Sequence, residues 1–139
     1  MKFIVALLLF ALALGICGCG GAQPSEVPND GKGQGLVSFR RVTSDEAAKM
    51  MAEEKDYIIL DVRTAGEYAG GHIPNAINVP NESINAAPPK ELPDKDQRIF
   101  VYCRSGSRSM QASQKLVDLG YTNIVEMGGI KDWHGEIVK

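Results

Sequence analysis

Apolar residues along the chain gather in short continuous runs, and amphipathic stretches separate these runs. Runs of four to six residues bounded by polar positions are typical of strands buried inside a parallel sheet. The pattern predicts strands over 37–42, 57–62, 76–79, 98–102 and 123–126. It predicts helices over 44–55, 64–70 and 107–119, and a last short helix that follows Gly129. Strands that alternate with helices indicate an α/β domain, an open parallel sheet with helices on both faces.

Local signals support the helix boundaries. Thr43 and Glu46 stand three residues apart, as in a capping box that opens a helix. The helix over 107–119 places apolar side chains on its inner face, and Gly120 ends it. The stretch 81–97 is broken by prolines, so we predict no regular element there.

The first residues of the chain do not belong to this domain. Residues 3–16 carry no charge or amide and follow Lys2, and small residues come after them. As a helix the run would be roughly 21 Å long, shorter than a bilayer core. A short core helix has the same composition, but the position at the N-terminus favours a secretory signal peptide over residues 1–18.

The end of this segment resembles the lipobox of bacterial lipoproteins. Ile16 stands three positions before Cys19 and the small residue Gly18 stands just before it, so Cys19 is the predicted lipidation site. Cys17 fits less well because Ile16 occupies the position of the small residue. The resemblance implies export and a lipid anchor on the extracytoplasmic side of a bacterial membrane, periplasmic or at the cell surface. An ordinary cleaved signal, which would release a soluble protein, is the alternative.

A tether is predicted between this anchor and the domain. Residues 19–36 are rich in glycine and proline and hold almost no apolar side chains. Such a sequence gains too little by burial to offset the entropy lost on ordering, so it behaves as a flexible linker. The folded domain is predicted over 37–139.

Composition excludes several functions. The chain has 15 Lys and Arg against 17 Asp and Glu, a net charge of −2, and no cluster of basic residues that would bind nucleic acid. Three cysteines are too few for a disulfide-built scaffold. If cleavage removes Cys17 and Cys19 carries a lipid, Cys103 is the only free thiol, and an unpaired thiol in an exported protein suggests reactivity.

The candidate chemistry lies in one loop that follows a buried strand and opens a helix. Its sequence is Cys103-Arg104-Ser105-Gly106-Ser107-Arg108. Ligands bind at the carboxyl ends of strands in open α/β sheets, and a helix N-terminus offers free N–H groups to anions. Glycine and serine let successive amides curl into an anion-binding nest. We therefore predict that Cys103 is a thiolate with a lowered pKa, without a histidine as base.

Several motifs together resemble the rhodanese-like family of sulfurtransferases. One block runs from Asp61-Val62-Arg63 through Glu67-Tyr68 and Gly71-His72-Ile73 to Pro80. The loop Cys103 to Ser109 matches the family's active-site loop, and Gly128-Gly129 with Trp133 matches its C-terminal end. The resemblance covers nearly all of 37–139 and implies the rhodanese fold.

The resemblance implies a double-displacement reaction that needs no cofactor and no metal. The Cys103 thiolate would take the outer sulfur of a small-molecule donor such as thiosulfate and hold it as a persulfide. A thiol acceptor or cyanide would then remove that sulfur. Arg104 and Arg108 would orient the donor and stabilise charge on the leaving sulfite, and the loop from Ser105 to Ser107 would cradle the persulfide.

Other polar residues receive structural interpretations. Asp61 and Arg63 end a strand near the loop, and we predict that Arg63 pairs with Glu67, four residues on, to brace the loop. His72 is expected to be a hydrogen-bonded turn residue and His134 a surface residue. Trp133 is expected in the core.

Two other functions stay open. A persulfide carrier or thiol-redox protein would use the same Cys103 to serve a partner protein. Phosphatases and arsenate reductases use a related loop, but they place five residues between the cysteine and the arginine, whereas four lie between Cys103 and Arg108. The shorter loop favours a sulfur-sized guest.

Overall fold

A computed structural model of the chain describes residues 38–139. The predicted signal peptide, the lipidation site Cys19, the tether over 19–36 and Val37 lie outside the described residues. Within 38–139, no helix combines the length and the apolar character that a membrane crossing requires.

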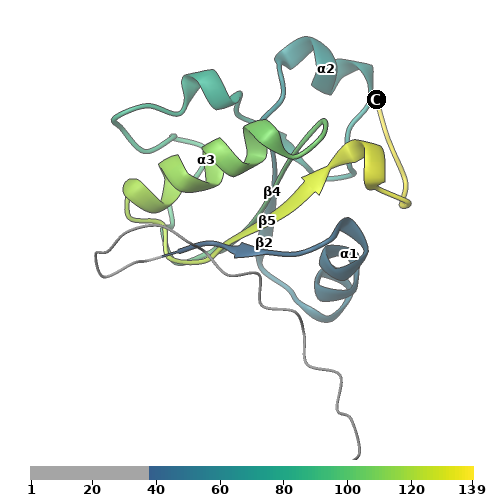
Figure 1. Cartoon of the computed structure of the whole chain (residues 1–139), viewed down its shortest axis with the longest axis horizontal. Coiled ribbons are helices and arrows are strands. Elements are labelled where there is room, and N and C mark those ends of the chain that lie inside the picture. The colour runs from purple at the N-terminus through teal and green to yellow at the C-terminus, as the bar shows by residue number, and fades with distance from the viewer. Residues whose placement is uncertain (1–37) are drawn as a thin grey trace, which may run out of the picture. The chain divides into compact units, whose positions relative to one another are not determined.

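The centre of the domain is a five-stranded sheet in which every neighbouring pair of strands is parallel (Figure 1). The strand order is β1-β5-β4-β2-β3. The strands are β1 (Arg40–Arg41), β2 (Tyr57–Asp61), β3 (Ile77–Asn78), β4 (Arg98–Cys103) and β5 (Ile124–Gly129). Because β2, β4 and β5 are central and covered on both faces, they are the strands with continuous apolar sequence.

Helices cover both faces of the sheet, which confirms the predicted fold class (Figure 1). The helices are α1 (Ser44–Glu53), α2 (Ala65–Gly70) and α3 (Ser107–Asp118), and two 3-10 turns are η1 (Asn81–Ser83) and η2 (Ile130–Asp132). Helix α3 packs Ala112 and Leu116 against one face of β4. Helix α1 packs Ala47 against the other face, which includes Phe100.

The helix signals in the sequence are present as local hydrogen bonds. The Thr43 hydroxyl accepts from the Glu46 amide, and the Glu46 carboxylate accepts from the Thr43 amide at 2.8 Å. At the other end of the chain, Gly120 follows the C-cap of α3 with φ at +92°, a conformation that favours glycine. Both features confirm the predicted boundaries.

Three elements differ from the prediction. The strand expected over 37–42 pairs with β5 only at Arg40–Arg41, since it lies at the sheet edge and has one neighbour. Strand β5 runs on to Gly129, which pairs with Cys103. The last helix is a single 3-10 turn over Ile130–Asp132, and Trp133 only caps it.

Candidate active site

Cys103 is the last residue of β4, and the loop after it leads directly into α3. The residue is only 1% exposed and is a free cysteine within residues 38–139. Gly106, the N-cap of α3, has φ at +104°, a left-handed conformation that a residue with a Cβ adopts only with strain. This backbone turn directs the Gly106 amide to the Cys103 sulfur, with N and Sγ 3.0 Å apart.

The sulfur lies among several donors, and they lower the pKa of Cys103. Burial acts in the opposite direction and raises the pKa, because it disfavours the charged thiolate. The Ser109 side chain, together with the amides of Ser109, Gly106 and Ser105, lowers the pKa by more than burial raises it. A sulfur with these neighbours is suited to carry negative charge, as a thiolate or as a persulfide.

The C-terminal end of β5 supports the loop from behind. A Cβ on Gly129 would overlap the carbonyl of Arg104 and would lie 2.7 Å from the Cα of Ser105. The Lys131 amide donates to the same Arg104 carbonyl at 3.3 Å. Only glycine at position 129 therefore lets the loop lie this close to β5, which gives a physical reason for one glycine of the Gly128-Gly129 motif.

Ser109 and Glu126 form a buried pair beside the sulfur. The Ser109 hydroxyl donates to Oε1 of Glu126 at 2.6 Å, and Glu126 is only 1% exposed. Glu126 also accepts from the Gly128 amide at 2.9 Å and from Nε of Arg41 at 3.3 Å. Ser109 lies in the motif of the active loop but had no predicted role, and Glu126 was not predicted as a site residue, although a lone carboxylate inside the apolar run 124–127 was a detectable signal.

We expect Ser109→Ala to raise the pKa of Cys103, because it removes a side chain that holds this pKa low and leaves the buried Glu126 carboxylate without its hydroxyl partner. At pH 7 a smaller share of the sulfur would then be ionised, so iodoacetamide would alkylate Cys103 more slowly. Alkylation rates measured from pH 5 to pH 9 would show the midpoint moving upward. Ser105→Ala is the matched control, since only its amide faces the sulfur, and an equal shift in both variants would contradict the role of the hydroxyl.

Arg108 is held by Glu67 in a two-pronged ion pair that joins α3 to α2. Nη1 and Nη2 of Arg108 donate to the two carboxylate oxygens of Glu67 at 2.7 and 2.9 Å. The hydrogen bond from Arg108 is the main cause that lowers the pKa of Glu67 to about 2, so this carboxylate is ionised throughout the neutral range. Glu67 thus braces the active loop from outside, through Arg108.

The predicted partner of Arg63 is wrong. Its guanidinium pairs with Asp61, with Nη2 and Oδ2 2.6 Å apart, and donates to the Gly71 carbonyl at 2.7 Å. The Tyr102 hydroxyl donates to the same carboxylate at 2.7 Å. The physical reason is that Arg63 precedes Thr64, the N-cap of α2, and so lies outside the helix in which an i,i+4 contact forms.

The remaining sequence-predicted residues are placed as follows. The Arg104 side chain is exposed and has no hydrogen-bond or ion-pair partner within 38–139. His72 is hydrogen-bonded as expected, with Nδ1 3.0 Å from the Tyr68 carbonyl, but its backbone pairs with Val138 in an isolated bridge and lies just before the turn. His134 is confirmed at the surface beside Asp45. Trp133 is only half buried and packs at the margin of the core.

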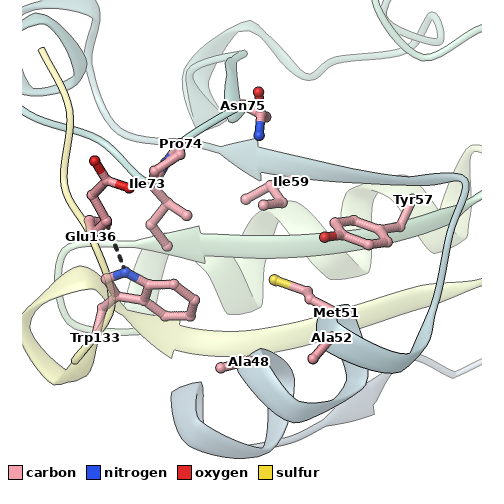
Figure 2. A pocket seen from close by; sticks show the side chains of 10 residues that line it. All are labelled: Ala48, Met51, Ala52, Tyr57, Ile59, Ile73, Pro74, Asn75, Trp133 and Glu136. Atoms are coloured by element: carbon pink, nitrogen blue, oxygen red, sulfur yellow. Dashed lines mark hydrogen bonds between the residues drawn. The ribbon is translucent and has the colours of Figure 1, made fainter.

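A separate cavity of about 410 Å³ lies on the α1 face and does not include Cys103. Figure 2 shows its mainly apolar wall, in which Met51, Tyr57 and Ile73 point inward and Trp133 donates to the Glu136 carbonyl. This wall contains no cysteine, histidine or cation. Among the described residues, no group of three His, Cys, Asp or Glu side chains is arranged to hold a metal ion.

Comparisons with known proteins agree with this geometry. Residues 43–136 match the model of the family described as "Rhodanese-like domain". The chain is 37% identical to a sulfurtransferase of Allochromatium vinosum over 68% of this chain and 89% of that protein. It is 37% identical to the thiosulfate sulfurtransferase PspE of Escherichia coli over 52% of this chain and 70% of that protein. A solved rhodanese with anions from E. coli matches with a TM-score of 0.55 and 35% identity, over 60% of this chain and 98% of the other.

Proposed function

Because the chain belongs to the rhodanese-like domain family and is a sulfurtransferase of the rhodanese type, we propose that it moves sulfur from thiosulfate to a thiol or cyanide through Cys103. The observation that carries this proposal is the sulfur of Cys103 within 3.0 Å of the Gly106 amide at the start of α3. Cys103 is buried, backbone amides surround its sulfur, and its pKa is lowered. These are the properties that a nucleophile needs for covalent catalysis. The similarity to a thiosulfate sulfurtransferase supports thiosulfate as the donor.

In the first step the Cys103 thiolate attacks the outer sulfur of thiosulfate. A bond forms between Sγ and that sulfur, the sulfur–sulfur bond of thiosulfate breaks, and its electron pair leaves with sulfite. The outer sulfur of the new persulfide carries the negative charge. The amides of the loop and the start of α3 stabilise this charge without rearrangement, because the backbone already holds them in place.

In the second step an acceptor thiolate attacks the outer sulfur of the persulfide. The bond between Sγ and the outer sulfur breaks, and its electron pair returns to Cys103 as a thiolate. The acceptor leaves as a persulfide, or as thiocyanate when cyanide is the nucleophile. The same hydrogen bonds that lower the pKa of Cys103 make it a better leaving group.

The two arginines have different roles in this proposal. Arg104 has no ion-pair partner within 38–139 and is free to contact the dianionic donor. The charge of Arg108 is matched by Glu67 at 2.7 Å, so we assign Arg108 mainly to holding the loop. The four residues between Cys103 and Arg108 make a phosphatase or arsenate reductase less consistent with the site, since the related loop of those enzymes has five residues there.

Intact-mass measurement before and after thiosulfate tests the proposal. We expect a gain of one sulfur atom on Cys103, which cyanide removes with release of thiocyanate. Protein alkylated on Cys103 beforehand is the control and should gain nothing. An alkylatable thiol that gains no sulfur would overturn thiosulfate as the donor. Loading without turnover on small thiols or cyanide would favour the persulfide carrier.

We also propose that the chain is exported and anchored by a lipid on Cys19. The support is the sequence Ile16-Cys17-Gly18-Cys19 after an uncharged apolar run. Protein extracted from membranes of a bacterial expression host should begin at Cys19 and carry an acyl mass increment. We expect Cys19→Ser to remove that increment, and Cys17→Ser, the matched control, to keep it. A membrane-extracted protein of unmodified mass would contradict the anchor.

A further inference from the structure

A groove of about 340 Å³ opens beside the active loop, and Arg104 is the only one of its residues to which the steps above give a contact with a substrate. Its walls come from α2 and from the turn after β5, and they include Arg104, the residue that follows Cys103. Gly66 and Gly70 on α2 present no side chain to the groove, and a Cβ added to either would enter open space. The volume of the groove is thus larger than that of an inorganic anion such as thiosulfate.

The groove has an excess of positive charge. Two of its charged residues are neutralised, since Arg63 pairs with Asp61 at 2.6 Å and Glu67 pairs with Arg108 at 2.7 Å. Lys131 also lines the groove and, like Arg104, has no ion-pair partner within 38–139.

The backbones of the two unpaired cations, Arg104 and Lys131, lie side by side. The Lys131 amide donates to the Arg104 carbonyl at 3.3 Å, so their side chains start from neighbouring points of the backbone. Their positive charges are therefore not dispersed over the surface but stand at one wall of the groove, next to the residue that follows the reactive sulfur.

Resting on the proposed function, we propose that this groove binds the sulfur acceptor, and that the acceptor is a thiol bearing carboxylates. Because Arg104 directly follows Cys103 in the chain, a carboxylate bound by Lys131 and Arg104 would hold the acceptor beside the active loop that carries the persulfide. The acceptor's sulfur then attacks the outer sulfur of the persulfide, and Cys103 leaves with the electron pair. Charge complementarity of this kind selects partners and speeds their encounter more than it adds affinity.

The experiment uses the full chain with Cys17→Ser and Cys19→Ser, so that Cys103 is the only thiol. Inorganic polysulfide installs the persulfide, and its discharge is then timed separately with mercaptosuccinate, which is anionic, and with thioglycerol, which is neutral. The ratio of the two rates within each variant cancels the intrinsic reactivity of each thiol. Because loading does not need thiosulfate, a failure of thiosulfate as donor would leave this measurement intact.

We expect Lys131→Glu to lower the ratio by about tenfold, and high salt to lower it in the wild type. Lys131→Arg should restore the ratio, because it keeps the charge. Lys55→Glu is the matched control, since this exposed lysine lies just before β2, at the opposite end of the sheet from the loop, and should leave the ratio unchanged. An unchanged ratio in Lys131→Glu, or an equal slowing with both thiols, would overturn the proposal.

Discussion

Cys103→Ser is expected to abolish sulfur transfer, with a fall of about 10⁴-fold or more in turnover. A serine hydroxyl at neutral pH is not ionised and forms no stable bond to the sulfur of the donor, so no covalent intermediate accumulates. Thiocyanate formation from thiosulfate and cyanide measures the loss, and intact mass measures the missing persulfide.

The loss should arise from chemistry and not from unfolding. A serine oxygen in this buried position still accepts from the Gly106 amide, so we expect the thermal midpoint to change little. The test is run with Cys17 and Cys19 also replaced by serine, which excludes transfer through another thiol. Turnover that persists in this background at more than trace level would contradict Cys103 as the nucleophile.

The outline of the fold was predictable because the central strands are apolar on both faces. The runs 57–62 and 98–102 correspond to β2 and β4 to within a residue, since strands that are covered on both sides need continuous hydrophobic sequence. The end of β5 was not predicted, because Gly128 and Gly129 carry the signal of a turn. Tertiary pairing with Cys103 extends the strand through them.

The location of the site could be predicted from the sequence, but most of its side-chain contacts could not. The loop, the helix N-terminus and the lowered pKa of Cys103 follow from local sequence alone. The partner of Arg63 was predicted wrongly even though the helix expected over 64–70 begins after Arg63. The i,i+4 spacing brings two side chains together only when both residues lie in the helix, so it did not apply to Arg63 and Glu67. Contacts across elements, such as Arg108 with Glu67, follow only from the packed domain.

Asp61→Ala is expected to lower the free energy of unfolding by about 3–5 kcal/mol, a large share of a small domain's stability. Asp61 is fully buried and accepts from both Arg63 and the Tyr102 hydroxyl. Its removal would leave the Arg63 guanidinium, whose side chain is 7% exposed, as a buried charge without its counterion. Urea unfolding followed by circular dichroism would measure the loss.

Two further variants separate this buried network from an ordinary ion pair. Asp61→Asn keeps an oxygen for the Tyr102 hydroxyl and loses only the charge. Its free energy of unfolding should therefore lie between those of the wild type and Asp61→Ala. Glu54→Ala breaks the partly exposed pair with Arg98, and we expect it to lower the free energy of unfolding by less than about 1 kcal/mol. If Glu54→Ala and Asp61→Ala lowered the free energy of unfolding equally, burial of the Asp61 carboxylate would not explain its contribution to stability. The ordering expected here follows because water can replace the partner of a half-exposed arginine, whereas the buried Arg63 has no such substitute.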